Sequence, residues 1–193
     1  MKRLTSGWSL VAIAACAIGL LPATSSAQSL SGQARAVQAT VVTPLGLTTS
    51  TLADTGSLNS PTDARDASQM TGSIDSLVTA ETLHATTIGS TDQVASEASV
   101  AGLTVAIGGT SVNAGFAQAR ATTGSKGVRT ATIHGLTING VPITASGDAN
   151  QTIAIPGGTI VINEQAGSVV NAIHVVINGV ADVVIASASA NAQ

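Results

Sequence analysis

The side chains best suited to acid–base or metal chemistry are the histidines, of which the 193-residue chain has three (His84, His134 and His174). Residues 133–140 and 173–179 are similar sequence segments, each of which begins with Ile-His and ends with Asn-Gly. The first segment has one residue more between the histidine and the turn. In a β-strand, His134 therefore lies on the same face as the residue that flanks its turn, whereas His174 lies on the opposite face. This near-repeat does not build a matched metal site, and we interpret the histidines as structural.

The last Asn-Gly step allows a register to be predicted. If residues 178–179 form a two-residue turn, Ile177 pairs with Val180 and the pairing continues outward from there. This register puts His174 and Asp182 on opposite faces of the hairpin, so they would not form a catalytic dyad. Both faces are then mainly apolar, which predicts cover on both sides, by a sandwich or by another molecule.

Glu164 is the one carboxylate that ends a strongly apolar predicted strand, which begins at residue 159, and two roles are open to it. It could be a general base with a raised pKa. We favour a structural role, in which it accepts backbone N–H groups at a strand end, because no second carboxylate stands at a defined spacing. An enzyme would need Glu164, His174 and Asp182 to converge from separate strands.

No established catalytic or metal-binding motif occurs in the sequence. The G-x-S-x-G, H-E-x-x-H, P-loop and EF-hand patterns are all missing from the sequence. We therefore predict that the protein is not an enzyme, with no catalytic, cofactor-binding or metal-ligating residues and no cofactor.

The N-terminal segment has the three parts of a secretory signal. A basic head (Lys2, Arg3) precedes the apolar run 8–21, and small residues lead to Ala27. We expect cleavage between Ala27 and Gln28, which assigns 1–27 to a signal peptide and 28–193 to one extracellular domain. The apolar run is too short to predict a lasting membrane span.

Cys16 is the only cysteine and lies inside that signal. The run Ile-Ala-Ala-Cys resembles a lipoprotein processing site, but the residues after Cys16 continue the apolar body, where a lipidated cysteine is normally followed by a polar tether. We therefore expect no lipid anchor at Cys16, and no disulfides in the mature chain. The expected location is the medium or the cell surface, with the periplasm as an alternative.

The composition of the mature part excludes several kinds of partner. After cleavage it holds one aromatic residue, Phe116, and its formal charge falls from −3 to −5 with the loss of Lys2 and Arg3. A single aromatic ring cannot form a stacking platform for single-stranded bases. The few basic residues are scattered along the sequence, so nucleic acid is not an expected partner. High hydrophobicity argues against disorder.

Branched aliphatic residues and regular turn signals indicate an all-β domain. Four hairpins are predicted, with turns at 108–109, 139–140, 156–158 and 178–179. We expect an antiparallel β-sandwich built from consecutive hairpins, with a β-solenoid as the alternative. Residues 28–45 read as a first strand or strand pair. Residues 46–72 read as a long surface loop with at most one short strand, with a small helix possible near 62–70.

The C-terminal third of the chain combines polar residues and a Pro-Gly turn in a distinctive order. They are Asn150, Thr152, Pro156, Gly157, Asn163, Glu164, Gln165, Asn171, His174 and Asp182. In these residues the chain resembles the choice-of-anchor P family, a group of bacterial exported domains that carry differing surface anchors. The resemblance covers roughly 120–190, and 31–34 and 77–81 look like earlier segments of the family. It implies a secreted or surface-displayed β domain in which the matched residues are structural, and the segment after residue 188 shows no sorting motif.

These observations predict a non-enzymatic, secreted or cell-surface structural or adhesive protein that self-associates. The expected partners are further copies of the chain, or components of the cell envelope or extracellular matrix. The alternative is an extracellular ligand-binding module for a polymer or an ice surface. Such a module would carry regular threonine ladders, of which only 130–132 is clear.

Overall fold

The structure, a computed structural model, describes residues 29–124 and 127–192. Every regular element in these two ranges is a β-strand, and all the strand pairs are antiparallel. This confirms the predicted all-β class and is consistent with the predicted sandwich. Cys16 and the expected cleavage site at Ala27 and Gln28 lie outside the described residues.

Sheet A has six strands in the order β12-β13-β14-β15-β1-β2. The first and last strands of the described chain are therefore neighbours, with Leu30 opposite Ala192. This pairing joins segments that are far apart in the sequence. The strands of sheet A are β1 (Leu30–Thr43), β2 (Gly46–Asp54), β12 (Gln151–Ile155), β13 (Gly158–Ala166), β14 (Val169–Ile177) and β15 (Ala181–Ala192).

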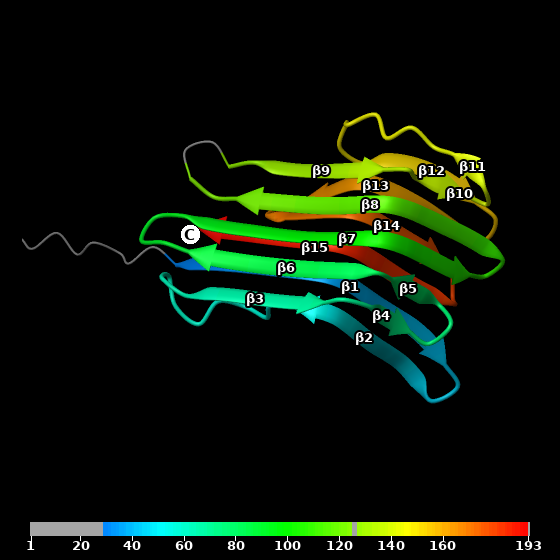
Figure 1. Cartoon of the computed structure of the whole chain (residues 1–193), viewed down its shortest axis with the longest axis horizontal. Coiled ribbons are helices and arrows are strands. Elements are labelled where there is room, and N and C mark those ends of the chain that lie inside the picture. Colours follow the sequence, from blue (N-terminus) through cyan, green and yellow to red (C-terminus); the bar gives the residue numbers. More distant parts are fainter. Residues whose placement is uncertain (1–28, 125–126, 193) are drawn as a thin grey trace, which may run out of the picture.

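Sheet B is built around the long hairpin of β7 and β8. Strands β6 and β5 pair with β7 one after the other, and β9 and β10 do the same along β8. Strands β1, β14 and β15 of sheet A lie over β6, β7 and β8 (Figure 1). The strands of sheet B are β3 (Ala64–Gln69), β4 (Gly72–Ile74), β5 (Val78–Ala80), β6 (Thr82–Gly89), β7 (Val94–Ile107), β8 (Thr110–Thr122), β9 (Arg129–His134), β10 (Thr137–Ile138) and β11 (Val141–Pro142).

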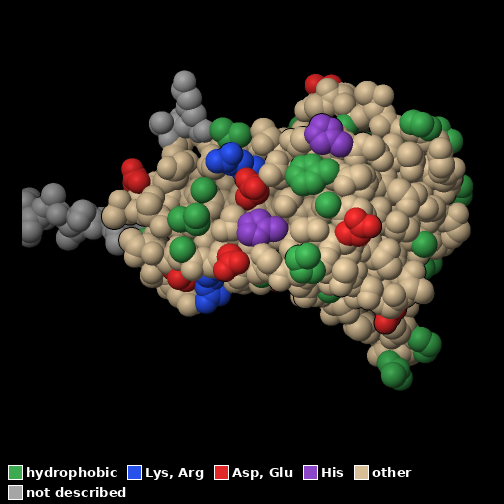
Figure 2. All heavy atoms as spheres, in the orientation of Figure 1, with side chains coloured by type: hydrophobic (Ala, Val, Ile, Leu, Met, Phe, Trp, Pro, Cys, Tyr) green, Lys and Arg blue, Asp and Glu red, His purple; other side chains and the backbone are tan. Residues whose placement is uncertain are grey.

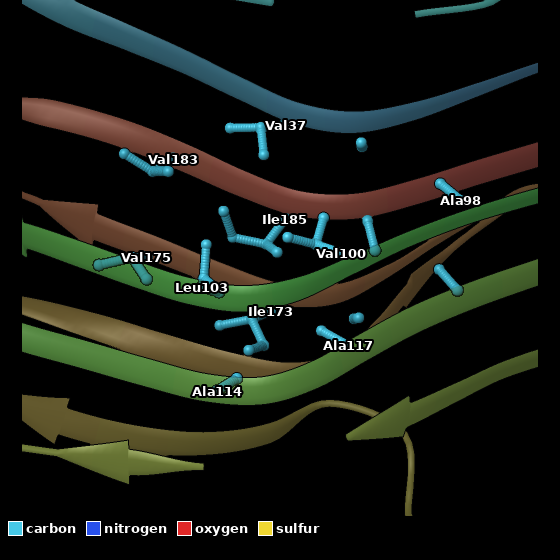
Figure 3. Close-up of a cluster of buried hydrophobic side chains, with 14 of the residues drawn as sticks. Val37, Ala98, Val100, Leu103, Ala114, Ala117, Ile173, Val175, Val183 and Ile185 are labelled. Carbon is cyan, nitrogen blue, oxygen red and sulfur yellow. The ribbon is translucent and has the colours of Figure 1, made fainter. Parts of the chain in front are cut away.

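The core between the sheets consists of aliphatic side chains. In Figure 3, Ile173 and Ile185 of sheet A lie close to Val100 and Leu103 of sheet B, and all four are at most 2% exposed. Alanines such as Ala117 fill the remaining positions. Small and branched side chains on both inner faces let the sheets pack closely without aromatic rings.

A row of small residues crosses the middle of sheet A and interrupts the ladder on every strand from β13 to β2. No ladder pair forms along this row, and Asn163, Ala186 and Ala53 have φ values of +49°, +49° and +46°. Each strand changes the phase of its inward and outward residues here, as at a β-bulge. We call these residues the kink row. Its members are Ala36, Ala53, Asn163, Ala172 and Ala186.

The prediction of a long loop over 46–72 is wrong. Strands β2 and β3 occupy most of it, and β3 replaces the small helix considered near 62–70, so that residues 55–63 alone connect β2 to β3. Both strands lie at sheet edges, where much of their surface is exposed. Their polar composition follows from that exposure, and it resembles the composition of a loop.

Two of the four predicted turns fall where expected. Ile107 faces Thr110 across Gly108-Gly109, and Ile138 faces Val141 across Asn139-Gly140. The third turn is shorter than predicted, because Ile155 pairs with Gly158 and only residues 156–157 form the turn. The fourth, at 178–179, has a different length, with consequences for the candidate site.

Candidate functional site: a histidine between two carboxylates

The loop between β14 and β15 has three residues, Asn178, Gly179 and Val180, instead of the two predicted. Ile177 pairs with Ala181, and the N–H of Val180 donates to the carbonyl of Ile177. Since side chains alternate along a strand, this single extra residue reverses the face of every residue in β15 near the turn. The predicted register is therefore wrong by one residue.

In the observed register one face of this hairpin is apolar and the other is mixed. Residues 173, 175 and 177 of β14 point into the core together with 181, 183 and 185 of β15. His174 and Asp182 share the outer face, contrary to the prediction that they lie on opposite faces. The prediction of two mainly apolar faces is wrong for the same reason.

His174 contacts a carboxylate through each ring nitrogen. Its Nδ1 lies 2.9 Å from Oε2 of Glu164, on β13, and its Nε2 lies 3.0 Å from Oδ1 of Asp182, on β15. While both carboxylates are ionised they can only accept, so this geometry fits the doubly protonated, cationic form of the ring, in which both nitrogens donate. We call His174, Glu164 and Asp182 the histidine triad. It joins three neighbouring strands of sheet A.

Glu164 does not take the role that we favoured from the sequence. Strand β13 continues past it to Ala166, so Glu164 does not end the strand. Its Oε2 accepts a hydrogen bond from Nδ2 of Asn171 at 2.6 Å as well as the one from His174. Its partners in the structure are side chains of β14, where we had expected backbone N–H groups.

The surroundings favour the charged form of both His174 and Glu164. Burial of the ring lowers the pKa of His174, but the hydrogen bond and charge of Glu164 and the charge of Asp182 outweigh it and raise this pKa above 6.5. Burial raises the pKa of Glu164, but hydrogen bonds from His174 and Asn171 outweigh it and lower this pKa below 4.5. The triad therefore holds a charged pair.

This arrangement is poorly suited to acid–base catalysis or metal binding. A general base or a metal ligand needs a ring nitrogen with a free lone pair, and each nitrogen of His174 is already directed at a carboxylate oxygen. The residues that an enzyme would need do converge, but their contacts satisfy one another. Across the described ranges, no cluster of three or more His, Cys, Asp or Glu side chains is arranged to hold a metal ion.

Three more residues of the family resemblance, Asn150, Asn163 and Gln165, form a second cluster. Nδ2 of Asn163 donates to the carbonyls of Gly147 and Asp148, at 3.0 and 3.2 Å, and Oδ1 of Asn150 accepts from the N–H of Gln165 at 2.8 Å. These bonds fix the loop before β12 onto β13. Thr152 donates to the carbonyl of Asn150, while Pro156 and Gly157 form the turn after β12.

The other two histidines lie apart from the triad, on the outer face of sheet B. Figure 2 shows this face with two histidines among scattered charges. Nδ1 of His84 is 2.8 Å from Oγ of Ser68, and the ring of His134 stacks on Phe116 with centroids 6.3 Å apart. The three histidines therefore do not assemble into one site.

Comparisons with known proteins add no relative. No family model, no curated protein and no solved structure matches the chain. Among the described residues, no helix has the length and apolar character needed to cross a membrane. The class of protein that the structure defines is therefore an all-β, antiparallel protein of two packed sheets.

Proposed function

We propose that this protein is a non-enzymatic structural domain that acts outside the cytoplasm, at the cell surface or released from it, through adhesive or self-associating contacts. The leader pattern in 1–27 and the resemblance of 120–190 to exported choice-of-anchor P domains support this location. The partners that we propose are further copies of the chain, and components of the envelope or matrix.

The histidine triad is the observation that carries the non-enzymatic part of the proposal. Among the described side chains it is the group most like an active site. Its hydrogen bonds connect β13, β14 and β15 to one another. A side chain that holds neighbouring strands together in this way serves the stability of the sheet. The triad is thus better explained as a structural clamp than as a catalytic group.

Cell fractionation combined with intact-mass measurement of the purified protein tests the proposed location. Cells that express the full chain should yield a product beginning at Gln28 in the medium, in the periplasm or on the surface. A lipidated product beginning at Cys16 would show an anchored protein. An uncleaved chain confined to the cytoplasm would contradict the proposal.

A ligand-binding module for a polymer or ice is the alternative, and one feature favours it. Thr130 and Thr132 both stand exposed on β9, the ladder that the sequence indicated. On sheet A, however, the hydroxyls of Thr40 and Thr49 are 2.9 Å apart and hydrogen-bond each other. Screens against glycan arrays and ice growth that give no binding would remove this alternative.

A further inference from the structure

The free edges of the two sheets differ in how they are protected against pairing with another strand. An edge strand exposes unpaired N–H and C=O groups, which proteins protect with charges, prolines or short strands. Strand β3 carries Arg65 and Asp66, β11 has two residues and contains Pro142, and β4 has three residues. On β9, the side chain of Gln165 covers the carbonyl of Arg129.

Strand β2 has none of these protections over residues 46–53. It lies at the border of sheet A (Figure 1) and spans nine residues, whereas β12 at the opposite border spans five and is followed by Pro156. Residues 46–53 include no charge and no proline. The first charged residue is Asp54, which is held by the guanidinium of Arg35 at 2.9 Å.

Exposed apolar side chains gather around the turn that leads into β2. Leu45 is 100% exposed and Leu47 73%, and Val42 and Val180 beside them are 50% and 42% exposed. Val42, Leu47 and Val180 line a groove on the outer face of sheet A between β2 and the β14–β15 loop. Exposed leucines and valines in one place commonly mark a contact surface.

We propose that β2 pairs antiparallel with β2 of a second copy, so that sheet A continues across a two-fold axis and the chain forms a closed dimer. The inference rests on the self-association included in the proposed function and names its surface. A second copy fits because 46–53 is uncharged and rich in threonine, so two such strands meet without like-charge repulsion. A two-fold contact uses the same surface on both copies.

The opposite border of sheet A limits growth beyond two copies. Strand β12 is short and is followed directly by Pro156, which has no N–H to donate to a ladder. A fibre would need β2 of one copy to pair with β12 of the next. The structure therefore favours a dimer over an open filament.

Placing a lysine on the edge tests the proposal. Protein purified from cells that express the full chain should show a concentration-dependent dimer by sedimentation velocity, and Thr49→Lys should raise its dissociation constant by roughly tenfold or more. Thr152→Lys on β12 is the matched control and should leave the dimer intact. Circular dichroism should show the same β signal for all three proteins.

A cysteine scan checks the register. Because Cys16 is the only natural cysteine and lies in the leader, Thr49→Cys should give a disulfide-linked dimer under mild oxidation and Thr152→Cys should not. A monomeric wild type at high concentration, or dissociation by Thr152→Lys alone, would overturn the dimer. Neither result would affect the proposed location, and an uncleaved cytoplasmic product would contradict the location without affecting the dimer.

Discussion

At the scale of single residues, the histidine triad selects one strand register over its neighbours. His174 meets both carboxylates only when Ile177 pairs with Ala181, and a slip of one residue would turn Asp182 to the other face. The apolar inner residues enforce the same register. The charged cluster and the core therefore agree on one arrangement of β14 and β15.

The triad should make stability depend on pH in a defined way. Because the pKa of His174 is raised, its contribution is complete below pH 6.5 and disappears as the pH rises through the folded-state value. Because the pKa of Glu164 is lowered, its contribution is present above pH 4.5 and disappears as the pH falls through the folded-state value. The combined contribution is largest between these two values.

Replacing His174 by Gln should remove this maximum. We expect the variant to lose about 1 kcal/mol of unfolding free energy between pH 4.5 and 6.5, since partly exposed ion pairs are screened. Urea unfolding of the wild type and His174→Gln across the pH range measures the difference. Asp54 and Asp63 also have lowered pKa values and add acid sensitivity common to both proteins.

His84→Gln is the matched control for this experiment. The ring of His84 contacts the hydroxyl of Ser68, and no ion pair to it is found among the described residues. Its unfolding curve should follow that of the wild type through the acid region. A difference curve for His174→Gln that stays flat with pH would contradict the assignment of the triad as a charged clamp.

At the scale of elements, strand β13 begins at a glycine, Gly158, where a neighbouring strand leaves no space for a side chain. A Cβ on Gly158 would overlap the carbonyl oxygen of Val176 on β14, whereas a Cβ on Gly157 would meet nothing within 4 Å. We expect Gly158→Ala to cost about 3 kcal/mol or more, because backbone must move.

Gly157→Ala, in the turn just before β13, is the comparison. Its φ of +72° disfavours an L side chain, so the cost should be about 1 kcal/mol, from backbone strain alone. Chemical denaturation of the two variants measures both values. Equal costs would show that the strands separate easily at this point.

The turn sequences predicted most strands, and the length of the loop at 178–180 differs from the prediction for a physical reason. Asn139-Gly140 and Asn178-Gly179 carry the same signal, yet the first closes a two-residue loop and the second belongs to a three-residue loop. The neighbouring strand β1 is part of the cause, because the N–H of Val42 donates to the carbonyl of Val180 at 2.9 Å. That contact spans most of the chain and leaves no local pattern.

The candidate site was missed as a direct consequence. The sequence indicates Glu164, His174 and Asp182 as candidate residues. Their convergence depends on whether Asp182 of β15 points to the outer face, which only the observed register determines. The kink row was invisible for a related reason. Alanines such as Ala53 and Ala186 adopt positive φ without any sequence pattern that announces it. Once the sheet is known, the shift in inward–outward alternation can be recognised from two consecutive buried residues, such as 185 and 186.

At the scale of the whole molecule, the near absence of aromatic residues gives a simple test of processing. The chain has one tryptophan, Trp8, and no tyrosine. If cleavage follows Ala27, the exported protein should show almost no absorbance at 280 nm and no tryptophan fluorescence. A purified extracellular product that retains tryptophan emission would place cleavage before Trp8 or exclude it.

Local sequence patterns do not distinguish a β-sandwich from a β-solenoid in this chain. Hairpins predict which consecutive strands pair, but the order of sheet A depends on β1 joining β15, and neither strand carries a signal for the other. What the composition did convey was a core of aliphatic side chains. The structure places that core between two sheets.

The pairing of β1 with β15 also determines how the domain would respond to tension. Leu30 lies opposite Ala192, so the first and last described residues leave sheet A at the same end. A force pulling these two ends apart would open the β1–β15 ladder one pair at a time, like a zipper, rather than load all its hydrogen bonds at once. The domain would thus yield to stretching by its ends at low force, well before its core is disturbed.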